Sequence, residues 1–97
     1  MDLSGNQVAV DKPLMLDEAK EIIYGQRQQE YGGVSDNFTR IANGWSEILG
    51  ARVTAEQVAL CMIWVKMSRL VKTPSHRDSK VDIAGYIGCM DKLERGE

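Results

Sequence analysis

The segment from Ala55 to Lys72 constrains the fold most, because it is apolar around most of a helical circumference. Thr54 and Gln57 form a capping box, which predicts that a helix begins at Ala55. Pro74 predicts that this helix ends near Lys72, because proline disfavours helical geometry in the residue before it. Its apolar residues are Val58, Ala59, Leu60, Cys61, Met62, Ile63, Trp64, Val65, Met67, Leu70 and Val71. A helix of this kind lies at the centre of a bundle or in a subunit interface.

Three further amphipathic segments, at about residues 14–29, 36–49 and 76–93, also predict helices. Pro13 precedes the first of them. Ser35 is a suitable N-cap for the second, and Gly50 is a suitable stop. Ser75 is a suitable N-cap for the last. No segment shows sustained strand-like alternation, so we predict an all-α fold, a bundle of four helices.

The length of the chain, 97 residues, fits one small domain. Residues 1–12 are polar and aperiodic and predict a disordered tail, which leaves 13–97 as a single helical domain. A domain of this size buries only about 60–65% of the surface that its unfolded chain exposes. We therefore expect self-association into a dimer or larger homo-oligomer to complete the bundle.

Charge and composition argue against several classes of protein. The formal charge is −2, and the Lys and Arg residues are scattered among the acids, whereas binding to duplex nucleic acid needs a concentrated basic patch. The N-terminus lacks the pattern of a signal peptide, and the longest apolar run is too short to span a membrane. Cys61 and Cys89 lack the spacing of metal ligands, so we interpret both as reduced thiols in the core of a cytoplasmic protein.

Polar residues on one face of the last predicted helix form the first candidate site. Asp78, Asp82 and Tyr86 follow one another at intervals of four and share that face. Two carboxylates at this spacing can share a Mg²⁺ ion, which would hold the phosphate oxygens of a nucleotide. The alternatives are a capping box between Ser75 and Asp78, and an ion pair for Asp82.

Lys66 and Arg69 are two cations within the apolar helix, about 60° apart around its axis. They face either the acids of the last helix or a ligand phosphate, which Arg binds through two parallel hydrogen bonds and Lys as a point charge. The alternative is that both side chains extend into solvent. His76, the one histidine of the chain, stands at a predicted helix N-terminus, where anions collect, or is simply exposed.

Arg27 and Tyr31 lie four residues apart near the end of the first predicted helix. They could present a cation and a stacking ring to a base, a sugar or a phosphate, or form a surface pair. Taken together, the candidate residues indicate either a nucleotide site or a structural network of ion pairs.

Four blocks of the sequence resemble a family of small phage and prophage proteins of unassigned function. They are Arg-x-x-x-Tyr-Gly at 27–32, Asn-Phe at 37–38, Lys-x-x-Arg-Leu at 66–70, and His-x-Asp-Ser-x-x-Asp-x-x-Gly-Tyr at 76–86. The resemblance covers about residues 14–93, and the last block is the most specific. It implies a phage-type protein that acts inside the bacterial host cell.

That family in turn distantly resembles the all-α, MazG-like nucleoside triphosphate pyrophosphatases. This resemblance implies a helical oligomer that binds Mg²⁺ through a Glu-x-x-Glu and a Glu-x-x-Asp motif and cleaves a nucleotide between its α- and β-phosphates. Asp78 and Asp82 would stand in for the second motif, at a spacing of four instead of three. The first motif departs further: Glu18 and Glu21 have its spacing but lie on the first predicted helix, and Glu56 stands alone.

The expected function is therefore that of a small nucleotide-binding protein, either a MazG-like pyrophosphohydrolase or a relative that retains the nucleotide pocket. The alternative is a non-catalytic anti-defence protein that sequesters a nucleotide signal or blocks a host protein. Release of pyrophosphate would separate the enzyme from the binding protein.

Overall fold

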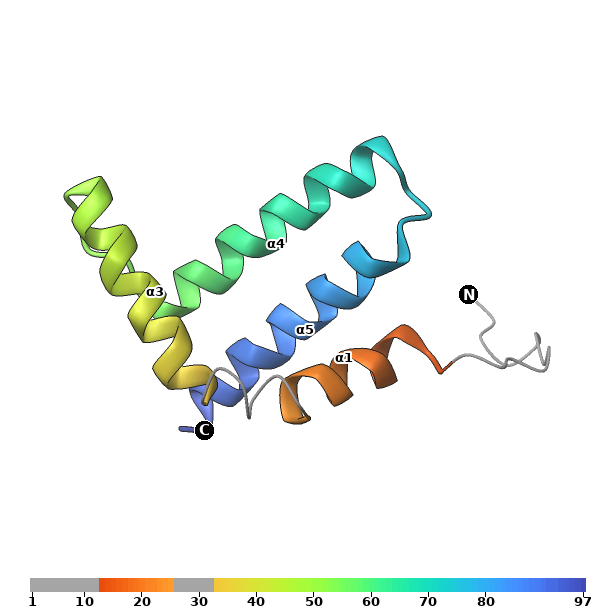
Figure 1. The fold of residues 1–97 in the computed structure, drawn as a ribbon, viewed down its shortest axis with the longest axis horizontal. Coiled ribbons are helices and arrows are strands. Elements are labelled where there is room, and N and C mark those ends of the chain that lie inside the picture. The colour runs from red at the N-terminus through yellow and green to blue at the C-terminus, as the bar shows by residue number, and fades with distance from the viewer. Residues whose placement is uncertain (1–12, 26–32) are drawn as a thin grey trace.

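The computed structural model describes residues 13–25 and 33–97, and all the regular structure in them is helical. The helices are α1 (Met15–Tyr24), α3 (Val34–Leu49), α4 (Ala55–Lys72) and α5 (Arg77–Glu94) (Figure 1). Over these residues, the all-α prediction and the four helices are confirmed. The tail expected at 1–12 and the part of the first predicted helix beyond residue 25 lie outside the described residues.

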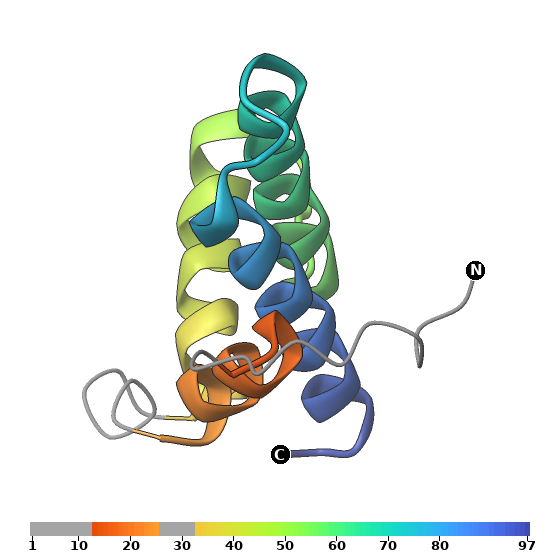
Figure 2. The ribbon, with the colours of Figure 1, turned by 90° about the vertical axis from the view of Figure 1, so that its right-hand side faces the viewer.

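The central helix of the bundle is α5, which packs against each of the other three. It runs beside α4 on one side and α1 on the other, while α3 crosses one end of the α4–α5 pair (Figure 1). Viewed from the end that carries the α4–α5 turn, α5 lies between α4 and α1 (Figure 2). The apolar helix α4 therefore flanks the bundle and leaves one of its sides uncovered.

Glycines on α5 allow α1 to approach closely. A Cβ atom at Gly88 would lie 2.6 Å from Cδ1 of Ile23, well inside van der Waals contact, whereas one at Gly85 would lie 3.9 Å from Cγ2 of the same residue. A side chain at Gly88 would therefore require the Cδ1 end of Ile23 to shift.

The core is small. Val34, Phe38, Ala59 and Cys89 form its buried cluster, and partly buried residues such as Ile23 pack against them. Both cysteines are free thiols, but only Cys89 is buried. The prediction that Cys61 is a core thiol is wrong, because Cys61 lies on the outer side of α4.

Two of the predicted helix boundaries are confirmed in atomic detail. The Thr54 hydroxyl accepts a hydrogen bond from the backbone N–H of Gln57 at 3.2 Å, and the Gln57 side chain accepts one from the backbone N–H of Thr54 at 2.9 Å. Gly50 ends α3 with a φ of 67°, in the left-handed region that glycine adopts without steric cost.

Two predicted N-caps are wrong. Helix α3 already begins at Val34, so that Ser35 lies inside it and makes no side-chain cap. The N-cap of α5 is His76 and not Ser75. The imidazole Nδ1 of His76 accepts the backbone N–H of Ser79 at 3.3 Å, which is the bond that a serine oxygen makes at other N-caps.

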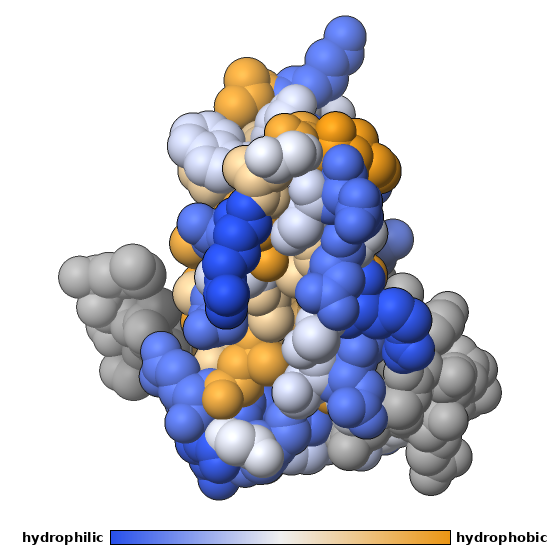
Figure 3. Space-filling model, turned by 90° about the vertical axis from the view of Figure 1, so that its left-hand side faces the viewer, coloured by the Kyte–Doolittle hydropathy of each residue, from blue (hydrophilic) through white to orange (hydrophobic). Residues whose placement is uncertain are grey.

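Hydrophobic side chains also reach the surface. Figure 3 shows a face on which hydrophobic side chains lie among hydrophilic side chains, and some of the hydrophobic side chains gather at its upper end, where α3 ends. Ile48 and Leu49, the last two residues of α3, are 81% and 67% exposed. Among the described residues, no helix has the length and apolar character needed to cross a membrane.

Candidate functional site

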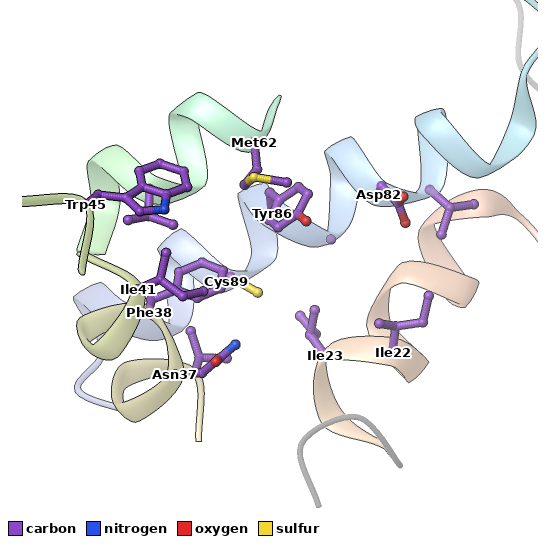
Figure 4. A pocket seen from close by; sticks show the side chains of 14 residues that line it. Ile22, Ile23, Asn37, Phe38, Ile41, Trp45, Met62, Asp82, Tyr86 and Cys89 are labelled. Atoms are coloured by element: carbon purple, nitrogen blue, oxygen red, sulfur yellow. The ribbon is translucent and has the colours of Figure 1, made fainter. Parts of the chain in front are cut away.

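A cavity of about 390 Å³ opens between α1, α3, α4 and α5 (Figure 4). Its wall is mostly apolar and includes three aromatic rings, those of Phe38, Trp45 and Tyr86. The Phe38 and Tyr86 rings lie 6.3 Å apart at an angle of 34°. We call this cavity the pocket; its volume lies in the range of small-molecule sites in proteins.

Three polar side chains line the pocket from two helices. Asn37 comes from α3, whereas Asp82 and Tyr86 come from α5, one turn apart (Figure 4). Ile22 and Ile23 of α1 lie across from them and close the opposite side. A few polar groups on an apolar wall are the usual means by which a pocket orients a ligand.

Asp82 also makes an ion pair between helices. Its Oδ2 lies 2.8 Å from Nζ of Lys66 on α4, and the two side chains are 27% and 13% exposed. Of the alternatives for Lys66, the structure therefore supports contact with an acid of the last helix. The pair holds a cation beside the pocket and joins α4 to α5.

Arg69 and His76 lie together in a second place, a shallow surface hollow beside the α4–α5 turn that also includes Lys72 and Thr73. Arg69 is exposed there, and His76 is half-buried. Because Nδ1 of His76 accepts the Ser79 N–H, the neutral ring carries its proton on Nε2. The hollow thus combines two cationic groups, Arg69 and Lys72, with one ring donor.

The pocket and the hollow lie along the same two helices. Lys66 is four residues beyond Met62 of the pocket wall, and Arg69 is three residues further on. At about 1.5 Å per residue, the step from Met62 to Arg69 is roughly 10 Å along α4. The structure therefore brings Lys66, Asp82 and Tyr86 together at the pocket and places Arg69, about two turns of α4 beyond Met62, with His76 in the hollow.

Asp78 is exposed and lies one turn before Asp82 on α5. It does not form the expected capping box with Ser75, because His76 is the N-cap, although it does lie in the first turn, where the helix dipole favours an acid. Arg27 and Tyr31 lie outside the described residues.

The predicted Mg²⁺ site depends on Asp78 and Asp82 alone. Over 13–25 and 33–97, no group of three or more His, Cys, Asp or Glu side chains is placed to hold a metal ion. A cation at Asp82 would also have to share that carboxylate with the Lys66 ammonium group at 2.8 Å. Magnesium binding here stays a prediction.

Of the residues that line the pocket, sequence reasoning singled out only Asp82 and Tyr86. Trp45 and Met62 had the spacing of ordinary core residues, and nothing in the sequence separates a core side chain from one that lines a cavity. Asn37 carried one signal, because it begins the Asn-Phe block of the resemblance.

Two polar clusters tie helices together away from the pocket. Arg77 of α5 pairs with Glu18 of α1 and donates to the backbone carbonyl of Pro13 at 2.7 Å. Buried Lys92 donates to the backbone carbonyl of Ile23 at 3.1 Å and lies 4.2 Å from the centre of the Tyr24 ring.

The hydroxyl of Tyr24 donates to the carboxylate of Glu97 at 3.3 Å. Desolvation, and then the nearby Glu97 charge, raise the pKa of this hydroxyl above its ordinary value. Tyr24 therefore stays neutral at physiological pH, and the contact fixes α1 to the C-terminal end of the chain.

Comparison with known proteins agrees with the expected phage-type relationship. The chain is 43% identical over 84 residues to the Gene 55 protein of Mycobacterium phage L5, which is 86% of this chain and 54% of that protein. It is 39% identical over 79 residues to the Gene 55 protein of Mycobacterium phage D29, covering 81% of this chain and 52% of that protein. The chain thus spans about half the length of both relatives.

No solved structure is significantly similar, so the likeness to MazG-like enzymes stays a prediction. One family model matches residues 14–94, almost the same range as the resemblance seen in the sequence. That match covers most of the chain, which therefore belongs to the family described as a domain of unknown function, DUF6378.

Proposed function

We propose that this chain binds a nucleotide, with the base in the pocket and the phosphates directed along α4 towards Arg69. The observation that carries the proposal is the pocket itself: an apolar, aromatic cavity of about 390 Å³ with an ion pair of Lys66 and Asp82 at its side.

The pocket wall suits a flat heteroaromatic base. The rings of Trp45 and Tyr86 offer stacking surfaces, and stacking on an aromatic ring contributes about 1–3 kcal/mol per base. The amide of Asn37 can both donate and accept, which matches the mixed polar edge of a base. The Asp82 carboxylate accepts hydrogen bonds and suits an amino group of the base or a ribose hydroxyl.

Two cations of α4 lie on the path that the phosphates of a nucleotide would take when its base lies in the pocket. Lys66 lies beside the pocket, and Arg69 lies about one turn further along α4. Phosphates bound near Arg69 would accept two hydrogen bonds from its guanidinium group. The Nε2–H of His76 is a further donor in the same hollow, and Arg27 and Tyr31 remain proposed contacts to the base or sugar.

Binding without hydrolysis is the first form of this proposal. Two observations favour it: the Asp82 carboxylate is already paired with the Lys66 ammonium group, and Asp78 is exposed. Such a protein would sequester a nucleotide signal of the host, with obstruction of a host protein as the alternative.

The second form is a MazG-like, Mg²⁺-dependent pyrophosphohydrolase, which the resemblance favours. Asp78 and Asp82 would hold the metal, and the bound metal would supply charge neutralisation at the phosphates. Lys66 would then have to move from Asp82 towards a phosphate oxygen. Because this chain spans half of its phage relatives, the activity of those longer proteins lies beyond the proposal.

Thermal shift with defined probes tests the proposal. The probes are the four ribonucleoside and four deoxyribonucleoside triphosphates, their nucleosides and inorganic triphosphate, each with and without MgCl₂. A probe at about a hundred times its Kd stabilises the native state by about 2.7 kcal/mol, which raises Tm by roughly 10–20 °C in a domain of this size. A nucleoside alone should produce a smaller rise, because it lacks the contacts in the hollow.

Two asparagines of α3 provide a matched pair of variants. Asn37→Ala removes a side chain from the pocket wall, whereas Asn43→Ala removes the same side chain from an exposed position on the same helix. The loss of one hydrogen bond of about 0.5–1.5 kcal/mol should weaken binding roughly 2- to 12-fold for Asn37→Ala only. Equal affinity of the two variants, or no response to any probe, would contradict the proposal.

Analysis of the bound nucleotide separates its two forms. An enzyme releases pyrophosphate in the presence of Mg²⁺. A sequestering protein returns the nucleotide intact when it is denatured.

A further inference from the structure

Helix α4 carries a stripe of exposed apolar side chains on a side that α1, α3 and α5 leave uncovered. Leu60, Trp64, Met67 and Val71 are 47%, 70%, 43% and 85% exposed. At 100° per residue, these four positions fall within about 60° of one another around the helix. We call them the α4 stripe. A contiguous apolar surface of this kind marks an interaction site in most proteins that have one.

We infer that the α4 stripe is a homodimer interface, in which α4 packs antiparallel against α4 of a second copy of the chain. The first argument is the spacing. The intervals between the four residues are four, three and four, which is the seam of a left-handed helical pair. A helix that is apolar on its core side and also on its outer side needs a packing partner on each of the two sides.

The second argument is that the stripe is complementary to itself. Its order of intervals reads the same in both directions, so a two-fold axis between Trp64 and Met67 maps the stripe onto itself. In that arrangement Trp64 meets Met67 of the second copy. The same axis places Leu60 against Val71 of the second copy. No other occupant is needed to cover all four side chains.

The third argument is electrostatic and selects the antiparallel orientation. Glu56, in the first turn of α4, lies about 50° from the centre of the stripe, so parallel packing would bring the two copies of this acid together at one end of the interface. Arg69 and Lys72, in the last turn, lie at about 170° and 110° from that centre and stay outside the interface. Antiparallel packing separates the two Glu56 side chains and opposes the two helix dipoles.

The proposed interface is independent of the pocket. Val58 and Met62, the pocket residues of α4, lie on the opposite side of the helix from the stripe, at about 160–200° from Leu60. A second copy on the stripe would therefore leave the pocket open. The dimer and the nucleotide site can be tested separately, and either one can fail alone.

Light scattering of the full chain, with a matched pair of variants, tests the interface. Met67→Glu places a charge in the stripe, whereas Val65→Glu places one on the same helix at about 160° from it. The two residues have nearly equal exposure, 43% and 45%, which makes Val65→Glu a matched control for a charge at a half-exposed position of α4. Because one helix from each copy makes a small interface, the measurement is made at about 100 µM.

The expected mass is twice the chain mass of 10.8 kDa for the unmodified chain and for Val65→Glu, and 10.8 kDa for Met67→Glu. Circular dichroism should show equal helix content for all three. A monomeric unmodified chain, or a Met67→Glu variant that remains dimeric, would overturn the inference.

Disulfide trapping tests the orientation, in chains that carry Cys61→Ser to remove the exposed native thiol. A mixture of Leu60→Cys and Val71→Cys chains should form a disulfide-linked dimer between the two variants on mild oxidation. Leu60→Cys alone should not, because antiparallel packing separates its two copies by about 16 Å along the helix, too far for a disulfide. Efficient linkage of Leu60→Cys to itself would overturn the antiparallel arrangement.

Discussion

The ion pair between Lys66 and Asp82 leads to a prediction about stability that is independent of any ligand. Asp82→Asn leaves the Lys66 ammonium group, whose side chain is only 13% exposed, without its carboxylate partner. Lys66→Met leaves Asp82, which at 27% exposure is more easily solvated. We therefore expect Asp82→Asn to destabilise the fold more than Lys66→Met.

The magnitude follows from the distance and the exposure. At 2.8 Å and an effective dielectric constant of about 20, the attraction between the charges is about 6 kcal/mol before desolvation. Exposed pairs retain about 0–1 kcal/mol of such attraction, and breaking a buried pair costs about 3–5 kcal/mol. This pair is intermediate in exposure, so we expect a loss of about 2 kcal/mol for Asp82→Asn and about 1 kcal/mol for Lys66→Met. The long Lys66 side chain can partly escape to solvent, which keeps the first value below the buried limit.

Urea unfolding, followed by circular dichroism, measures the free energy of unfolding of both single variants and the double variant. The double-mutant cycle should give a coupling energy of about 1 kcal/mol. Lys72→Met, an exposed cation at the end of α4, is the control and should change stability by less than about 0.5 kcal/mol. A coupling energy within about 0.3 kcal/mol of zero would refute the reasoning, because the pair would then not hold Asp82 in place beside the pocket.

Three further predictions concern helix packing, capping and phosphate contact. Gly85→Ala should stabilise by about 0.5–1 kcal/mol, because its Cβ would make only an ordinary contact at 3.9 Å. Gly88→Ala should raise Tm less than Gly85→Ala or lower it, because its Cβ would lie 2.6 Å from Cδ1 of Ile23, which must shift. Equal Tm changes in thermal unfolding would contradict the packing. Thr54→Ala should cost about 0.5–2 kcal/mol in urea unfolding through loss of the capping box, and an unchanged midpoint would show that the cap is dispensable. Arg69→Lys should weaken nucleotide binding, measured by calorimetry, roughly 10- to 100-fold, and more than Lys66→Arg does. Unchanged affinity would show that Arg69 does not contact the phosphates.

Local signals in the sequence predicted the helices well. The capping box at Thr54 and Gln57 and the left-handed Gly50 depend on neighbouring residues only, and both are present in the structure. The cap of α5 was placed one residue early because a histidine ring is an uncommon substitute for a serine oxygen. His76 takes that role because its Nδ1 also contacts the Ser79 hydroxyl at 2.7 Å.

Contacts between helices were harder to predict. The sequence left Lys66 facing solvent, an acid of the last helix or a ligand phosphate, and the structure shows it paired with Asp82. The spacing that united Asp78 with Asp82 did not indicate that Asp78 is exposed. A nucleotide pocket with Asp82 and Tyr86 was expected, but its apolar wall was not predicted. Its wall consists of residues such as Trp45 and Met62, and their periodicity is identical whether they fill a core or surround a cavity.

Nuclear magnetic resonance of the methionine methyl groups tests the central claim, that the pocket binds a nucleotide, most directly. Among the five methionines of the chain, Met62 lines the pocket, whereas Met67 lies on the outer side of α4. During titration with the nucleoside triphosphate that raises Tm most, the account predicts a saturable shift of the Met62 methyl signal and an unchanged Met67 signal. A saturable shift at Met67 with none at Met62, or no shift at either, would contradict it.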